Sequence, residues 1–213
     1  MKTTVILLRH AQSEGNRQKI YVGHSELPLS PLGLKQAKVS ADYIAGGGLP
    51  RPDVILSSDL IRAIQTALPI SLALGLPILP DPALREIYSG SWEGRSMDDL
   101  SSITPEGYRL WREDPANSRP GDGESMRELY ERIGGAFDRV VETYRGKTVL
   151  LVTHATPIRC LHCRAIYGTV ERMAETDWFP NASFTVLEEE NGVLRETVGG
   201  FDGHLAGELL FIE

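Results

Sequence analysis

The sequence has few cysteines, no long hydrophobic run and no excess of basic residues. Its two cysteines, Cys160 and Cys163, are too few for a disulfide framework. The longest apolar run near the start, residues 5–8, is far shorter than a membrane span or a signal-peptide core. Asp and Glu number 29 against 22 Lys and Arg, and this net charge of −7 argues against nucleic-acid binding through bulk charge. We therefore expect a cytoplasmic protein that binds neither nucleic acid nor membrane.

The remaining composition is that of an ordinary globular chain. Of its 213 residues, 41% are apolar and 24% are charged, which excludes global disorder. This length suits one domain with a full hydrophobic core better than two very small domains. The chain contains no repeat, low-complexity segment or interdomain linker. We predict a single domain over residues 1–213.

Short apolar runs alternate with longer helical patterns along the chain. The apolar runs read as central strands covered on both faces, because they lack strict alternation. Expected strands lie at 4–8, 53–56 and 148–152, expected helices at 31–46, 59–74, 124–144 and 157–167, and an expected hairpin at 183–198. This alternation predicts an α/β fold, a three-layer α/β/α sandwich with a mainly parallel central sheet.

Residues 88–122 differ from the rest of the chain. They are rich in Gly, Ser, Pro and charge, and they contain Trp92 and Trp111. Such a segment within an α/β domain is usually an insertion over one end of the sheet. We expect a lid-like insertion over the active-site edge. The two tryptophans either line a pocket or anchor the insertion.

Cationic side chains follow the predicted central strands. The first strand is followed by Arg9 and His10 and the third by His154, and Arg62 lies in the first turn of the helix after the second. Ligands of open parallel sheets collect at the carboxyl ends of the strands, so these side chains converge there unless they are unrelated surface cations. A tetrahedral phosphate dianion would satisfy such a cluster. The arginines would repel a divalent metal ion, and we predict no metal site.

The histidine that follows the strand-end arginine also suggests catalysis. A neutral imidazole attacks phosphorus well when its other nitrogen donates a hydrogen bond. Phosphoryl transfer further needs a proton for the leaving oxygen. Glu86, between a short expected strand and the insertion, is placed to supply it. The alternative interpretation is an ordinary surface glutamate.

Five sequence blocks resemble those of the histidine phosphatase superfamily, the phosphoglycerate mutase-like proteins. They appear in the order of that family and cover most of the chain: RHAQSEGN at 9–16, SSDLIRAIQTA at 57–67, LREIYSGSWEG at 84–94, GDGES at 121–125 with Arg132, and VTH at 152–154. The Arg-His pair alone would be a weak signal. The five blocks in order are specific.

The resemblance implies a catalytic role for five residues. His10 would be the nucleophile that forms a phosphohistidine. Arg9, Arg62 and a protonated His154 would bind the phosphoryl group. Glu86 would be the general acid in the first half-reaction and the base that activates water in the second. The implied reaction needs no cofactor.

The resemblance also implies substrate-binding residues. Asn16 and the amide of Ala155 would assist in binding phosphate, and Gly23 would lie beside the substrate. Ala11 replaces the commoner glycine of the family, a change shared by many of its phosphatases. Residues 155–159 stand where other members of the family have a glycine-rich sequence. The helix start that binds the anion is kept, but fewer backbone conformations are accessible to it.

The chain resembles the phosphatase branch more than the mutases, which carry a longer insertion. Its last third is similar to metal-independent phosphoserine phosphatases, which implies that His204 approaches the substrate. Those relatives have a histidine just after the glutamate, where this chain has Tyr88. Phosphoserine, sugar phosphates and ribazole phosphate therefore all stay open as the small phosphomonoester substrate.

Two other functions stay open for this chain: a phosphoglycerate mutase-type phosphoryl transfer and a non-catalytic phospho-ligand binder. Dimers are frequent among relatives, so a homodimer is one expected state.

Three further features carry simpler interpretations. The Cys160 and Cys163 pair has no second pair, so two buried thiols on a helix are favoured over zinc. For His24 we favour a solvated loop histidine over a substrate contact. For Arg159 we favour an ion pair on the helix surface over a substrate contact.

Overall fold

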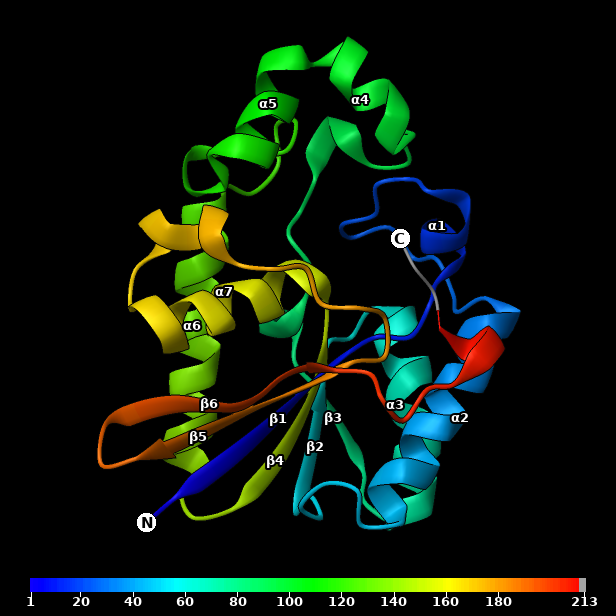
Figure 1. The fold of residues 1–213 in the computed structure, drawn as a ribbon, viewed down its shortest axis with the longest axis vertical. Coiled ribbons are helices and arrows are strands. Elements are labelled where there is room, and N and C mark those ends of the chain that lie inside the picture. Colours follow the sequence, from blue (N-terminus) through cyan, green and yellow to red (C-terminus); the bar gives the residue numbers. More distant parts are fainter. Residues whose placement is uncertain (211–213) are drawn as a thin grey trace.

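The computed structural model describes residues 1–210 and contains a six-stranded sheet in the order β3-β2-β4-β1-β5-β6 (Figure 1). The strands are β1 (Thr3–Arg9), β2 (Val54–Ser57), β3 (Ile78–Pro80), β4 (Thr148–Thr153), β5 (Phe184–Glu190) and β6 (Val193–Phe201). The pairs β3–β2, β2–β4 and β4–β1 are parallel. The predicted hairpin, β5 and β6, adds antiparallel to β1. The prediction of a mainly parallel sheet is confirmed.

Helices cover both faces of this sheet. They are α1 (Glu14–Gln18), α2 (Pro31–Ala45), α3 (Ile61–Leu74), α4 (Met97–Ile103), α5 (Pro105–Glu113), α6 (Met126–Thr143) and α7 (Ala155–Tyr167). The 3₁₀ turns lie at Pro82–Leu84, Gly90–Trp92, Pro115–Asn117, Val170–Glu175 and Gly207–Leu209. Helices α2 and α3 lie on one side of the sheet and α6 and α7 on the other (Figure 1). The three layers follow the prediction.

Alternation along the central strands builds two cores. In β1, Val5 and Leu7 belong to the core under α6 and α7, whereas Ile6 and Leu8 belong to the core under α2 and α3. Successive side chains of a strand point to opposite faces, so an all-apolar strand is what two covered faces require.

The helix boundaries follow from local capping. Ser30 accepts a hydrogen bond from Gly33 N at the start of α2, and Ser125 forms a capping box with Glu128 at the start of α6. Helix α7 begins at Ala155, two residues before the predicted start, with His154 as its N-cap. This earlier start brings the first amides of α7 to the carboxyl edge of the sheet. Within residues 1–210, no helix is long and apolar enough to cross a membrane.

The insertion, residues 88–122, carries α4 and α5 beyond the carboxyl ends of the parallel strands (Figure 1). Trp92 is buried, and Tyr21 makes edge contacts with Trp92 and Trp111 at centroid distances of 5.4 and 5.6 Å. Main-chain bonds add to this contact. Tyr21 N donates to Arg95 O at 2.8 Å, and Ile20 forms a β-bridge with Ser96. The insertion is therefore joined to the loop that follows α1, and lid-like movement stays a prediction.

The central strands are expected to carry much of the stability. Leu151→Ala in β4 removes a fully buried side chain and should lower the free energy of unfolding by about 3 kcal/mol. Leu72→Ala on α3 is the matched control, because Leu72 is 75% exposed, and it should change stability by less than about 0.5 kcal/mol. Urea unfolding of both variants measures the difference. Equal losses would contradict the placement of Leu151 in the core.

Candidate active site

The ends of β1 and β4 bring two histidines together. The strands pair in parallel register up to Arg9 and Thr153, so His10 and His154 follow side by side. His10 N donates to Thr153 O at 2.9 Å, and the two imidazole rings meet edge to face with centroids 5.1 Å apart. Both histidines are buried. The parallel register thus places both rings at the edge where ligands bind such sheets.

His10 has the protonation state and the tautomer that a nucleophile needs. Its Nδ1 lies 2.7 Å from Ala11 O, so Nδ1 carries the proton and donates, and Nε2 keeps its lone pair. Burial, followed by the charges of Arg62 and Arg9, holds the pKa of His10 well below its usual value. The imidazole is therefore neutral at neutral pH. A neutral ring with an available Nε2 can attack phosphorus.

His154 is also neutral before an anion binds, and the protonated His154 expected at the phosphoryl group stays a prediction for the anion-bound state. Burial and the nearby Arg62 hold its pKa well below the usual value. Its Nε2 lies 2.8 Å from Ser58 Oγ, whereas its buried Nδ1 has no hydrogen-bond partner within residues 1–210. A phosphoryl oxygen would satisfy such a group, and a bound dianion would raise the pKa of His154.

Two buried guanidinium groups lie at the same edge. Arg62 is 1% exposed and donates to Gly23 O at 2.7 Å and to Ser25 O at 3.0 Å. Burial lowers its pKa to about 10, which still leaves it charged at pH 7. Arg9 donates through Nη1 to Phe179 O and lines the adjoining cavity. Two cations in a low dielectric favour the binding of an anion.

Glu86 lines the same cavity, and its surroundings favour the protonated form that a general acid needs. Its Oε1 accepts a hydrogen bond from Ile87 N at 2.8 Å, and its Oε2 lies 3.4 Å from Thr156 N. Burial raises the pKa of Glu86. Its carbonyl accepts hydrogen bonds from His24 Nε2 at 2.9 Å and from Arg132 Nη2 at 3.1 Å. His24 is thus half-buried and holds Glu86 in place, which corrects the favoured interpretation of a solvated loop histidine.

A carboxylate that sequence reasoning did not single out holds the loop around Gly23. Glu93 accepts hydrogen bonds from Gly23 N at 3.1 Å, His24 N at 2.8 Å and Ser25 N at 3.2 Å. Gly23 is required there, because a Cβ would lie 2.4 Å from Ile87 O. Burial opposes the charge of Glu93, but these hydrogen bonds and that of Ser25 Oγ lower its pKa overall. The available signal was the position of Glu93 within the block at 84–94.

Two asparagines support the nucleophile. Asn16 lines the cavity, and its Oδ1 accepts a hydrogen bond from Ser13 N at 3.0 Å. Asn181 Nδ2 donates to His10 O at 3.0 Å and lies 3.3 Å from Asn16 Oδ1. Ala155 lines the cavity at the first position of α7. The structure therefore brings Asn16 and Ala155 to the site, and Asn181 fixes the backbone of His10.

His204 lies elsewhere, which corrects its assignment as a substrate contact. Its ring packs on Tyr43 and Phe184 with centroids 5.2 and 4.9 Å away, and its Nε2 lies 3.0 Å from Ser40 Oγ. Burial lowers its pKa to about 4. It is part of a packed aromatic cluster against α2.

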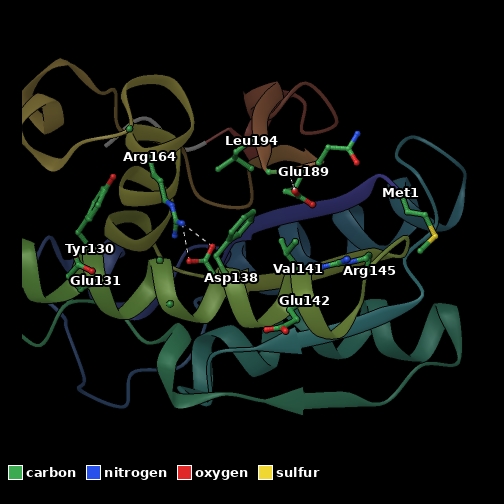
Figure 2. A pocket seen from close by; sticks show the side chains of 16 residues that line it. Met1, Tyr130, Glu131, Asp138, Val141, Glu142, Arg145, Arg164, Glu189 and Leu194 are labelled. Atoms are coloured by element: carbon green, nitrogen blue, oxygen red, sulfur yellow. Dashed lines mark hydrogen bonds and ion pairs between the residues drawn. The ribbon is translucent and has the colours of Figure 1, made fainter.

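A cavity of about 510 Å³ opens onto Arg9, Asn16, Glu86 and the amino end of α7. Tyr21, Trp111 and Trp178 form part of its wall, together with residues of α4 and α5. Trp111 thus both lines the cavity and anchors the insertion, whereas Trp92 only anchors it. A larger cavity of about 940 Å³ lies between α6, α7 and the hairpin, and no predicted site residue lines it (Figure 2).

The wall residue Trp178 rests on a buried cation. The guanidinium of Arg159 lies 4.1 Å from the centroid of the Trp178 ring and donates to Met173 O and Thr176 O at 3.0 and 3.1 Å. Arg159 is 4% exposed, so the expectation of a pair on the helix surface is wrong. Arg159 therefore supports this wall of the cavity through its contact with the Trp178 ring.

A family model described as the histidine phosphatase superfamily (branch 1) matches residues 5–198. The chain belongs to the histidine phosphatase superfamily. Phosphoserine phosphatase 1 of Hydrogenobacter thermophilus is 34% identical over 186 residues, 87% of this chain and 86% of that protein. A probable phosphoglycerate mutase of Yersinia pestis is 38% identical over 161 residues, 74% of this chain and 72% of that protein.

The fold agrees with this family. The solved structure of a mycobacterial glucosyl-3-phosphoglycerate phosphatase has a TM-score of 0.84 at 27% identity, covering 94% of this chain and 99% of that one. The predictions of the histidine phosphatase superfamily, of its fold, and of an enzyme that hydrolyses phosphomonoesters are confirmed. The roles of individual residues stay predictions.

The Glu93 carboxylate should stabilise this histidine phosphatase in a pH-dependent way. Glu93→Gln should lower the free energy of unfolding at pH 7 by about 1–2 kcal/mol, because an amide oxygen binds the loop amides less strongly. The pKa of Glu93 is lower in the folded protein than in the unfolded chain. Its contribution is therefore complete above the unfolded pKa and is lost as pH falls through the folded one.

Urea unfolding between pH 7 and pH 3 measures this effect. The difference between wild type and Glu93→Gln should shrink with acidification, whereas the exposed control Glu142→Gln should show little difference throughout. A difference that is independent of pH would show that the charge of Glu93 does not hold the loop.

Proposed function

We propose that this phosphatase hydrolyses a small phosphomonoester through a phosphohistidine on His10. The observation that carries the proposal is the neutral, buried His10, whose Nδ1 is bonded to Ala11 O while its Nε2 stays available beside the Arg9 and Arg62 charges. This state supplies a nucleophile without a base to activate it.

In the first half-reaction, His10 Nε2 attacks phosphorus in line with the leaving oxygen. The N–P bond forms as the P–O bond breaks, and the leaving oxygen takes the proton of Glu86. Arg9, Arg62 and an N–H of His154 bind the equatorial oxygens, with Asn16 and the amide of Ala155 assisting. The alcohol then leaves.

In the second half-reaction, the Glu86 carboxylate takes a proton from water. The water oxygen forms a bond to phosphorus as the N–P bond breaks, which releases inorganic phosphate and restores His10 and protonated Glu86. Every proton and electron pair in both steps is supplied by the chain, the ester or water. The proposal therefore needs no cofactor, and the two arginines would repel a divalent metal ion.

The substrate class follows only coarsely from relatives. Their names include phosphoserine phosphatase and glucosyl-3-phosphoglycerate phosphatase, so phosphorylated amino acids and sugar-linked phosphates are the first esters to test. A cytoplasmic location is supported by the free thiols of Cys160 and Cys163, which suit a reducing compartment. A homodimer stays a prediction of the family resemblance.

The nucleophile assignment predicts that His10→Ala abolishes activity. Phosphate release from a panel of phosphomonoesters in EDTA should fall by at least about 10³-fold, and a phosphoenzyme should be trapped from wild type only. His204→Phe is the matched control, because it keeps the ring stacking on Tyr43 and removes a histidine remote from the cavity. Release that survives His10→Ala would overturn the proposal.

The same panel separates the alternative functions. With 3-phosphoglycerate, a mutase would convert the ester to its isomer, depend on a bisphosphate primer and release little phosphate. A binding module would do neither. Net phosphate release without a primer supports hydrolysis.

The acid role of Glu86 predicts a dependence on leaving group and pH. Glu86→Gln should lower kcat/KM for alkyl phosphates by about 10²–10⁴-fold, but less for p-nitrophenyl phosphate, whose leaving group needs little protonation. With that ester the variant should show a burst of nitrophenol, because its phosphoenzyme lacks the base for hydrolysis. In wild type, kcat/KM for alkyl esters should fall as pH rises through the raised pKa of Glu86, and the variant should lose this limb. An unchanged pH profile would contradict the assignment.

A further inference from the structure

The segment that follows β2 places a serine hydroxyl against His154. Strands β2 and β4 pair in parallel register up to Ser57 and Val152, and Ser58 N donates to Val152 O at 2.8 Å. Ser58 therefore leaves the sheet beside the end of β4, where His154 is the N-cap of α7. Its Oγ lies 2.8 Å from His154 Nε2, and both side chains are fully buried. No step of the proposed reaction uses this hydroxyl.

The hydrogen bonds around Ser58 decide which nitrogen of the neutral His154 ring carries the proton. A neutral imidazole donates through one nitrogen and accepts through the other. Leu60 N donates to Ser58 Oγ at 3.3 Å, and within residues 1–210 His154 Nε2 is the one acceptor that this hydroxyl can reach. If Nε2 carried the proton, the hydroxyl hydrogen would be buried without a partner, which is costly. Ser58 therefore donates to Nε2, and the proton of His154 lies on Nδ1.

The start of α7 leads to the same tautomer from the other side of the ring. An N-cap side chain that accepts a hydrogen bond takes it from the second or third amide of its helix. In α7 the second amide, Thr156 N, is directed to Glu86 Oε2 at 3.4 Å, and Pro157 at the third position has no N–H. A lone pair on His154 Nδ1 would therefore meet no donor, and among the described residues this buried atom has no partner. An N–H on Nδ1 is instead matched by a phosphoryl oxygen.

We propose that Ser58 is a positioning residue that holds His154 in the Nδ1–H tautomer, so that the neutral ring presents a hydrogen-bond donor to the phosphoryl group. This inference rests on the proposed function, in which an N–H of His154 binds the equatorial oxygens. The tautomer of His10 is set by the Ala11 carbonyl, which can accept but not donate. The tautomer of His154 is set by a hydroxyl that donates. A second proton on Nε2 would deprive this hydroxyl of its acceptor, so Ser58 also disfavours the imidazolium before an anion binds.

Charged and titratable groups on four other elements also act on His154. They are Arg62 on α3, His10 after β1, His24 in the loop after α1 and Arg132 on α6, and each disfavours the protonated ring. Substitution of Ser58 leaves all four in place. A change in the tautomer of His154 on that substitution is therefore assigned to the hydroxyl.

NMR of the protein with ¹⁵N-labelled histidines measures the tautomer directly, because a ring nitrogen without a proton resonates far from one that carries it. At pH 7 the wild-type His154 ring, assigned by its loss in His154→Asn, should show a proton on Nδ1 and none on Nε2. Ser58→Ala should lose this exclusive state. Ser57→Ala is the matched control and should keep it, because Ser57 Oγ donates to Ser58 O at 2.8 Å and, within residues 1–210, forms no hydrogen bond to His154. A wild-type proton on Nε2, or an Nδ1–H state unchanged in Ser58→Ala, would overturn the proposal.

Inhibition by inorganic phosphate separates positioning from a merely structural role. With p-nitrophenyl phosphate as substrate, Ser58→Ala should raise the inhibition constant of phosphate by about fivefold to tenfold at pH 7. At pH 5 this increase should largely disappear, because an imidazolium bound to the anion carries a proton on both nitrogens. Ser58→Thr keeps the hydroxyl and should recover most of the affinity. An increase of the same size at both pH values, or no recovery in a Ser58→Thr variant whose urea unfolding matches wild type, would contradict the role of Ser58.

The two measurements distinguish failure of this inference from failure of the proposed function. If wild type hydrolyses p-nitrophenyl phosphate through His10 while His154 carries its proton on Nε2, the proposed function stands and the role of Ser58 is wrong. If no ester is hydrolysed and phosphate does not bind, the proposed function is wrong and the role of Ser58 is lost with it.

Discussion

The site depends on how one buried positive charge is held. Arg62 is almost fully buried, and within residues 1–210 its guanidinium bonds to the carbonyls of Gly23 and Ser25 and to no carboxylate. A carboxylate partner would neutralise the charge, whereas carbonyl dipoles satisfy the N–H groups and leave the charge to act on an incoming anion. This arrangement works only if both carbonyls face the guanidinium. Glu93 meets that requirement by binding the amides of the same loop.

Burial, and after it the same charge, sets the states of the two histidines. Burial and Arg62 keep both imidazoles neutral, so His10 retains its lone pair and His154 adds no further positive charge to a crowded edge. Arrival of a phosphoryl dianion reverses the sign of the local field. A proton on His154 then becomes favourable, so substrate binding and proton uptake are coupled.

Sequence reasoning located the residues that follow the ends of strands, because strand ends are readable from apolar runs and parallel strands share one ligand-binding edge. It missed the partners that fix these residues. Ser58 beside His154 and Glu93 below Gly23 act through side-chain hydrogen bonds between segments far apart in the chain, for which local patterns give no signal. Arg159 and His204 were misplaced for a related reason. Whether a polar side chain on a helix or in a tail becomes buried depends on packing that one sequence does not display.

The insertion and the loop after α1 share more than aromatic packing. Tyr21 N donates to Arg95 O, Gly94 N donates back to Tyr21 O, and Lys19 O accepts a hydrogen bond from Met97 N. These main-chain bonds join two stretches that are distant in sequence into one wall of the cavity. A graft that exchanged residues 88–122 alone between relatives would keep these bonds only if the new segment followed the same backbone path. This wall of the cavity is therefore a discontinuous unit of the chain, and recombination transfers it with both of its original halves only by moving the two stretches together.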